Sequence, residues 1–295
     1  METAQIVQQT INGLALGSLY ALIAIGYTMV YGILRLINFA HGDVLMMGCY
    51  VAWFGAVMFG LPWWAALVGA MALTALLGVV IDQGAYRPLR RAPRISALIT
   101  AIGVSFFLEN FGLVVFGGRP KAFARPEIFN QILEWGDIRV LSLSLWVPVF
   151  TAIILALLLF IIYRTRTGMA MRALSRDMVT VRLMGIDTDR VVAITFALGS
   201  ALAAAGGVFW AMKYPQINPL MGVLPGLKAF VAAVLGGIGN VVGAMLGGIL
   251  LGLAEILLVA WLPDLAGYRD ALAFILLIGI LIFRPTGIMG EELPE

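Results

Sequence analysis

The sequence predicts an all-α fold, a polytopic bundle of transmembrane helices, and two observations carry that prediction. Hydrophobic residues make up 62% of the chain and charged residues only 12%, with a mean hydropathy of +1.00. Soluble domains carry about 25% charged residues. The apolar residues also form long continuous runs, whereas the strands of a membrane barrel alternate apolar and polar side chains. The sequence therefore predicts a helical protein embedded in a membrane.

Eight continuous apolar runs are candidates for helices that cross the bilayer. A bilayer core requires about 20 apolar residues per helix, and most of the runs reach that length. The seventh run is long enough for two short helices, or for one helix and a re-entrant segment. We therefore expect a single transmembrane domain, residues 1–295, with about eight to ten passes and with broken or re-entrant helices among them. The runs cover residues 8–33, 39–60, 62–82, 95–116, 145–163, 191–212, 227–262 and 269–284.

The longest charged stretch of the chain, residues 163–190, separates two apolar runs. It holds six arginines and three aspartates but no lysine, and so long a charged segment cannot lie in lipid. We expect it to form a surface on which a cytoplasmic partner docks. The alternative is a solvated loop that anchors the topology and docks nothing. Its charged residues are Arg164, Arg166, Arg172, Arg176, Asp177, Arg182, Asp187, Asp189 and Arg190.

The basic loops indicate how the chain is oriented. A second basic cluster, Arg87, Arg90, Arg91 and Arg94, lies between the third and fourth runs. Two predicted passes separate the clusters, so both can face the cytoplasm, as short basic loops do. The segment 117–142 then faces outward, although it carries basic residues of its own. The sequence pI of about 9.2 is typical of such a membrane protein and does not indicate nucleic-acid binding.

The junction between the first two runs is unusually polar. It holds the only histidine of the chain, His41, between Asn38 and Asp43. Polar groups at membrane depth are costly unless they are paired or hydrated. In one interpretation Asn38 or Asp43 caps the second helix, with His41 at the level of the lipid headgroups. In the other, this segment is a broken or re-entrant elbow that lines a translocation path, and Gly42 permits the turn.

Glycine marks how the helices pack, because pairs spaced four residues apart let two backbones approach closely. The chain has 34 glycines, and many crowd into the seventh run. Ordinary packing inside the bundle is one interpretation of that run. The other is that Gly236, Gly237 and Gly239, together with Asn240, break the helix and line a path or a moving interface. The spaced pairs are Gly13/Gly17, Gly243/Gly247 and Gly248/Gly252.

Two carboxylates, Glu109 and Glu255, lie within apolar runs, where an ionisable group is a functional candidate. One interpretation is a hydrogen bond between helices, with Asn110 or another polar neighbour as the partner. The other is a proton relay.

Nothing in the sequence indicates an enzyme. The HExxH, GxSxG and Walker patterns of hydrolases and nucleotide-binding proteins do not occur. One histidine and one aspartate, without further histidine or cysteine nearby, do not make a metal site. We expect no catalytic residue, no metal and no directly bound cofactor.

Several segments together resemble the membrane permeases of branched-chain amino acid ABC transporters. The resemblance covers essentially the whole chain and points to the shorter of the two permease types, which has little beyond the membrane core. The similar segments are Gln9-Thr-Ile-Asn-Gly-Leu-Ala-Leu-Gly-Ser18, Asn38-Phe-Ala-His-Gly-Asp43, Gly168-Met-Ala-Met-Arg-Ala173, Leu183-Met-Gly-Ile-Asp187 and Val234-Leu-Gly-Gly-Ile-Gly-Asn240.

The resemblance implies a permease subunit of an ABC importer in the bacterial inner membrane, which translocates branched-chain or related amino acids. Its implied partners are a homologous second permease, two cytoplasmic ATP-binding subunits and an extracytoplasmic substrate-binding protein, besides membrane lipid. ATP would be used by the partner subunits, and their closure would drive alternating access.

The resemblance also implies that the charged stretch is a coupling loop. A helix over residues 172–181 would fit a groove on the ATPase, with Gly168 and Gly185 bracketing it. Arg172, Arg176 and Asp177 would supply polar contacts. The Glu-Ala-Ala…Gly pattern of many ABC importers is replaced here by Arg172-Ala-Leu-Ser-Arg-Asp177, so the role carries over without individual contacts.

Other functions stay open at this point. Urea, short-chain amide and sugar ABC permeases share a similar elbow or glycine-rich plan. A proton-coupled secondary transporter would belong to a different class. It would use Glu109 or Glu255 and would need no ATPase.

Overall fold

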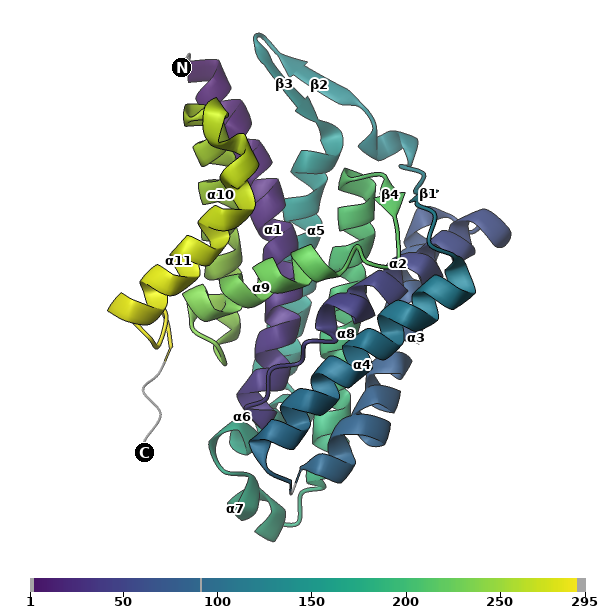
Figure 1. Ribbon diagram of the computed structural model, residues 1–295, viewed down its shortest axis with the longest axis vertical. Helices are drawn as coiled ribbons and strands as arrows, with labels where there is room; N and C mark the ends of the chain where they lie inside the picture. Colours follow the sequence, from purple (N-terminus) through teal and green to yellow (C-terminus); the bar gives the residue numbers. More distant parts are fainter. Residues whose placement is uncertain (1–2, 91, 291–295) are drawn as a thin grey trace.

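The computed structural model describes residues 3–90 and 92–290, and most of these residues lie in helices (Figure 1). The all-α polytopic bundle is therefore confirmed. The helices are α1 Thr3–Leu34, α2 His41–Met58, α3 Trp63–Ile81, α4 Arg94–Phe116, α5 Ser142–Arg164, α6 Arg166–Arg176, α7 Met178–Leu183, α8 Thr188–Lys213, α9 Val223–Gly236, α10 Val241–Trp261 and α11 Arg269–Phe283. At its end, α3 continues into a π-helix, Asp82–Tyr86, and a 3-10 turn, Arg87–Leu89.

Within the described residues, seven helices are long and apolar enough to cross a membrane. The sequence led us to expect about eight to ten, and α2 and α9 account for the difference. At about 1.5 Å per residue the 14 residues of α9 extend about 21 Å, short of a bilayer core of about 30 Å. α2 has only 18 residues and carries two polar side chains in its first turn.

The centre of the bundle is α1, which runs through the molecule and packs against α10 (Figure 1). Their contact is made by glycine. A Cβ atom at Gly17 would lie 2.7 Å from the Cα of Ile249, and one at Gly252 would collide with the backbone of Gly17. The packing expected from the Gly13/Gly17 and Gly248/Gly252 pairs is thereby confirmed. The other pair, Gly243/Gly247, faces α9 instead, where their backbones meet Gly236.

The predicted break in the seventh run is also confirmed. α9 ends at Gly236 and α10 begins at Val241, and between them Gly237 and Gly239 have φ values of +108° and +100°. Residues with a Cβ atom rarely adopt such angles. The side chain of Asn240 caps α10 by accepting a hydrogen bond of 2.9 Å from the N–H of Gly243.

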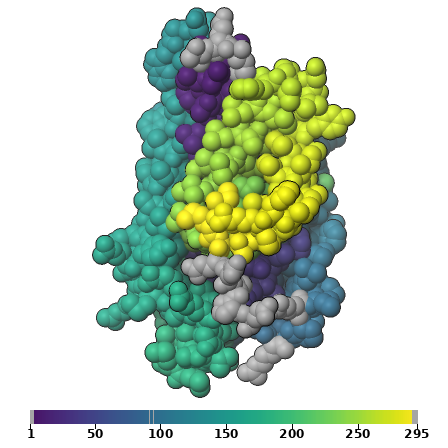
Figure 2. Space-filling view, turned by 90° about the vertical axis from the view of Figure 1, so that its left-hand side faces the viewer, coloured from purple at the N-terminus to yellow at the C-terminus, as the bar shows by residue number. Residues whose placement is uncertain are grey.

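The two ends of the molecule differ in character (Figures 1 and 2). One end carries a β-hairpin of β2 Ile132–Trp135 and β3 Ile138–Leu141, together with the beginning of α1. Just inside it β1, Lys121–Ala122, pairs with β4, Gln216–Ile217. The opposite end carries α6 and α7. We call these the hairpin end and the α6–α7 end.

Ion pairs at the α6–α7 end join the two basic clusters. Arg87 and Arg90 contact Asp189 at 2.7 and 2.5 Å, and Asp189 lies in the first turn of α8, which a short turn connects to α7. Both clusters therefore lie on one side of the bundle, as the sequence predicts. Of this group, Arg91 lies outside the described residues.

Candidate functional site

The polar segment between α1 and α2 is a re-entrant elbow. Residues 35–40 leave the end of α1 and turn back, so that α2 begins beside the middle of α1. Nε2 of His41 lies 3.1 Å from the carbonyl oxygen of Ile23, and its ring packs on Tyr27 at 4.5 Å between centroids. Ile23 is eleven residues from the end of α1, which is about 16 Å along the helix axis. His41 is buried within the bundle beside this part of α1.

The alternative that Asn38 or Asp43 caps α2 is wrong. The residue before α2 is Ala40, and no side chain caps the helix. Both polar residues bind side chains of other segments instead. Asn38 accepts a hydrogen bond of 2.8 Å from the hydroxyl of Tyr86, and Asp43 accepts one of 2.5 Å from the hydroxyl of Ser105 on α4.

Beside the elbow lies a small cleft of about 110 Å³, between the start of α2, the middle of α4 and the start of α9. Its polar groups are the carboxylates of Asp43 and Glu109 and the hydroxyl of Ser105. Its apolar wall is formed mainly by Tyr27, Phe39, Val223 and Leu227. The cleft thus places two carboxyl groups beside an apolar surface, between the starts of α2 and α9 and the middle of α4.

Gly42 allows the starts of α2 and α9 to touch. A Cβ atom at Gly42 would collide with the carbonyl group of Gly222 and would lie 3.4 Å from the Cα of Gly226. The first turns of both helices therefore meet at the cleft. A helix N-terminus carries a partial positive charge on its unpaired N–H groups.

The second predicted part of the path, Gly236, Gly237, Gly239 and Asn240, does not reach the cleft. These residues lie at the far end of α9, whereas the cleft is at its beginning. There they pack against the end of the chain, where the amide of Asn240 donates to the carbonyl of Met289 at 2.9 Å. The geometry brings Asn38, His41, Gly42 and Asp43 together and leaves the glycine turn apart.

The charged stretch forms two helices, not the single helix expected over residues 172–181. α6 folds back tightly on the end of α5, because a Cβ atom at Gly168 would collide with the carbonyls of Ile161 and Ile162. The guanidinium of Arg172 stacks on the ring of Tyr163 at 5.1 Å, and Arg176 is the last residue of α6. Gly185, with a φ of +80°, ends α7 as predicted.

Asp177 explains why the helix is divided. Its carboxylate accepts hydrogen bonds from the N–H groups of Val179 and Thr180, at 2.9 and 3.1 Å, and so caps α7. The hydroxyl of Thr180 donates to the same carboxylate, and this hydrogen bond is the main cause that lowers the pKa of Asp177. The side chain expected to reach a partner is therefore occupied within its own loop.

Apolar side chains on and beside α7 were missed by the sequence analysis. Val179, Leu183 and Met184 are 71%, 83% and 74% exposed, at an end of the molecule rich in charged residues. Exposed apolar groups outside the bilayer mark surfaces that bind other proteins. The sequence does contain a signal for this surface, because these apolar residues occur in an otherwise charged loop. The many arginines of the loop drew attention away from them.

Glu255 is fully buried and binds charged side chains of two other helices. Its Oε2 accepts hydrogen bonds from the hydroxyl of Tyr20 at 3.0 Å and from Nε of Arg269 at 2.7 Å. Its Oε1 forms an ion pair with Lys228 at 2.9 Å, and Lys228 also contacts Asp270 at 2.6 Å. This geometry favours the interpretation of Glu255 as a polar link between helices.

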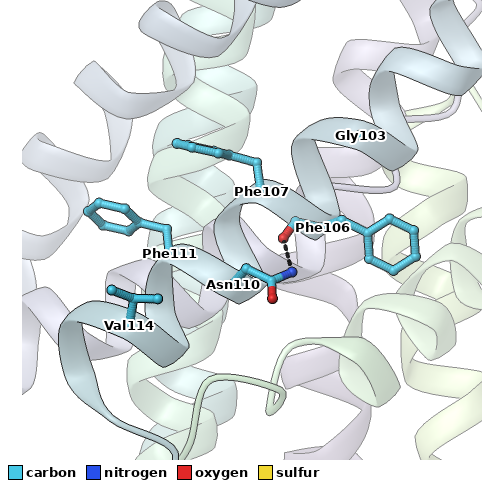
Figure 3. Close-up of a pocket in the computed structure, with 6 residues that line it drawn as sticks. All are labelled: Gly103, Phe106, Phe107, Asn110, Phe111 and Val114. Atoms are coloured by element: carbon cyan, nitrogen blue, oxygen red, sulfur yellow. Dashed lines mark hydrogen bonds between the residues drawn. The ribbon is translucent and has the colours of Figure 1, made fainter.

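Glu109 and Asn110 do not form the expected hydrogen bond. Consecutive residues of a helix point about 100° apart, and the amide of Asn110 donates instead to the carbonyl of Phe106 at 2.7 Å. Asn110 lies in an open hollow of about 500 Å³ along the exposed face of α4. Figure 3 shows its aromatic lining, in which Phe107 and Phe111 point to the same side. Glu109 lies on another side of α4 and faces the cleft with Asp43.

The bundle is that of a polytopic membrane protein, with a polar cleft between its helices, and comparisons with known proteins give its family. The family model described as branched-chain amino acid transport system / permease component matches residues 9–281. The chain is 46% identical to the high-affinity branched-chain amino acid transport system permease protein LivH of Escherichia coli, over 97% of this chain and 96% of LivH. It is 43% identical to BraD of Pseudomonas aeruginosa over the same shares, and 26% identical to the ribose import permease RbsC of E. coli over 79% of this chain and 68% of RbsC.

The chain belongs to the family of branched-chain amino acid transport permease components. It is a multi-pass protein of the bacterial inner membrane and a transport subunit.

Proposed function

We propose that this chain is a membrane subunit of an ABC importer for branched-chain or related amino acids. LivH and BraD carry that substrate class in their names, and the chain matches them over nearly its full length. In this proposal two cytoplasmic subunits hydrolyse ATP, a homologous second permease completes the passage, and an extracytoplasmic protein delivers the substrate.

The single observation that carries the substrate class on the structural side is the cleft beside the elbow. An amino acid carries an ammonium group, a carboxylate and a side chain. Asp43 and Glu109 would attract the ammonium, and the N-termini of α2 and α9 would face the carboxylate. The apolar wall suits an aliphatic side chain. A neutral sugar would leave the carboxylates without a cationic partner, so the cleft favours an amino acid over ribose.

Docking of the ATPases is assigned to α6 and α7. Gly168 holds α6 against the bundle and Gly185 ends α7, while Arg172 and Arg176 are exposed on α6. Leu183, which is 83% exposed, would be buried in the complex. Loss of such an anchor typically costs about 2 kcal/mol, which weakens binding roughly thirtyfold.

The test is co-purification and uptake. We expect the tagged protein to bring down two ATP-binding subunits and a second permease, and the reconstituted complex to import labelled leucine only with ATP and the binding protein. Leu183→Glu should reduce the amount of co-purified ATPase, whereas Ile128→Glu on the outer segment, also exposed, should not. A chain that purifies alone and drives uptake from a proton gradient would contradict the proposal and return Glu109 and Glu255 to the centre of the mechanism.

A further inference from the structure

A buried charge cluster at the α6–α7 end connects α3 to α8. The guanidinium of Arg90 lies between two carboxylates, with Nη2 2.6 and 2.8 Å from the two oxygens of Asp82 and Nη1 2.5 Å from Asp189. The side chain of Asp82 is only 1% exposed and that of Arg90 12%. Arg87 also reaches Asp189, but its side chain is half exposed and it makes no ion pair with Asp82 among the described residues.

One side of this cluster belongs to the docking segment. Asp189 lies in the first turn of α8, and Asp187 caps that helix by accepting a hydrogen bond of 3.1 Å from the N–H of Arg190. Only a short turn separates this cap from α7, whose last residue is Leu183. The carboxylate that holds Arg90 therefore lies six residues beyond the end of α7, within the next helix.

The other side of the cluster leads to the elbow. Asp82 is the first residue of the π-helix, and Tyr86 is the last. The buried hydroxyl of Tyr86 donates to the side-chain oxygen of Asn38 at 2.8 Å, and the carbonyl of Asn38 accepts a hydrogen bond of 3.1 Å from the N–H of His41. A π-helix is a rare, locally irregular turn that occurs frequently at functional sites.

A role in stability alone does not explain this arrangement. Buried charges cost desolvation free energy, so an apolar contact of similar volume would stabilise the fold at least as well. An arginine bound between two carboxylates fixes their relative positions, because the N–H groups of its planar guanidinium must point at the carboxylate oxygens. The cluster therefore sets the position of α8 relative to the π-helix, and the π-helix sets the position of the elbow.

We infer that Asp189, Arg90, Asp82, Tyr86 and Asn38 form a relay that transmits movement of α7 to the elbow. Arg90 and Tyr86 are then positioning residues for transport, acting through Asn38 on the segment that lines the cleft. The inference rests on the proposed function, since an ATPase must dock at α7 for the relay to receive a movement. The inference concerns how hydrolysis is coupled to passage, not whether the subunits assemble.

The experiment measures labelled leucine imported per ATP hydrolysed, in proteoliposomes that contain the complete complex and its binding protein. We expect Tyr86→Phe and Arg90→Met to retain the ATPases but to import less leucine per ATP, by roughly the 5- to 150-fold typical of couplings between sites. The matched controls are Tyr50→Phe and Arg139→Met. Tyr50 is also fully buried, and its hydroxyl has no partner among the described residues, while Arg139 forms its ion pair with Glu134 in the hairpin, away from the cluster.

A double variant decides whether the residues act in series. If they do, Tyr86→Phe combined with Arg90→Met should lower the ratio no further than the stronger single variant does. Arg90→Lys, which keeps the charge but not the planar guanidinium, should recover the ratio only in part. If Arg90→Met does not assemble, Tyr86→Phe decides alone, because it removes a single hydroxyl.

The inference is overturned if Tyr86→Phe imports as much leucine per ATP as the wild-type protein. It is also overturned if the loss in the double variant equals the product of the losses in the two single variants. An unchanged ratio with a lower melting temperature would assign the cluster a purely structural role. These results differ from a failure of the proposed function, in which the wild-type protein itself would bind no ATPase or import no leucine with ATP.

Discussion

Gly42 is the residue on which the geometry of the elbow most directly depends. It lies where α2 and α9 meet, with the carbonyl of Gly222 in the space that any side chain would occupy. Larger residues would separate the two helix starts and open the cleft. The same position carries no positive φ, so the requirement comes from close approach and not from backbone strain.

We predict that Gly42→Ala lowers leucine uptake and destabilises the protein by about 1–3 kcal/mol, the usual cost of overpacking a filled site. The matched control is Gly69→Ala on α3, where a Cβ atom would meet nothing within 4 Å. Uptake measured in cells, together with thermal unfolding in detergent, tests both. Wild-type uptake by Gly42→Ala would remove the elbow from the translocation path.

Of the seven candidate membrane-spanning segments, the one that contains α11, Pro263–Phe283, is the least buried within the molecule. Polar contacts connect the first turn of α11 to the interior of the bundle. Arg269 and Asp270 bind Glu255 of α10 and Lys228 of α9, which lie in the interior. Glu255 therefore holds three helices together, with the hydroxyl of Tyr20 adding α1.

We predict that Glu255→Gln destabilises the protein by about 3–5 kcal/mol, because it leaves the buried Lys228 and Arg269 short of negative charge. Asp270→Asn, whose side chain is 56% exposed, should cost less than about 1 kcal/mol. Thermal unfolding of the purified variants measures both. A proton relay would give the opposite pattern, with stability unchanged and the proton dependence of transport altered.

For the molecule as a whole, the two ends must lie on opposite sides of the membrane. The hairpin end carries the two small sheets, and the α6–α7 end carries the joined basic clusters (Figure 1). Positive loops remain on the cytoplasmic side, so we assign the α6–α7 end to the cytoplasm. The beginning of α1 then lies outside, where Gln8 accepts a hydrogen bond from the N–H of Arg139 in the hairpin.

Thiol labelling tests this orientation with little background, because the only cysteine, Cys49, is fully buried. We predict that Asp137→Cys in the hairpin reacts with a membrane-impermeant reagent once the outer membrane is opened. Arg182→Cys on α7 should react only after the inner membrane is also permeabilised. Both positions are exposed, so access is the only difference between them. The reverse pattern would place α7 outside and contradict ATPase docking there.

Local chemistry was enough to predict the helical class, and it offered the break at Gly236–Asn240 and the re-entrant elbow each as one of two interpretations. Continuous apolar runs long enough to span a bilayer form helices in lipid. At the break Gly237 and Gly239 adopt positive φ values, whereas the adjacent glycines Gly206 and Gly207 lie within α8, so adjacent glycines do not by themselves end a helix. The number of spans was less predictable, because an apolar run does not reveal where a helix turns back inside the bundle. α2 and α9 were counted as passes for that reason.

Only the tertiary structure shows which polar side chains of distant segments form hydrogen bonds or ion pairs with one another. Asp43 and Ser105, Tyr86 and Asn38, and Arg90 and Asp189 are far apart in the chain, and no periodicity or spacing connects them. The fold likewise separated the glycine turn from the cleft and used the exposed side chain of Asp177 as the cap of α7. Composition and local sequence determine what each segment can be in a membrane. Which polar groups meet there depends on how the helices pack, because a buried polar group takes whichever partner that packing brings within hydrogen-bonding distance.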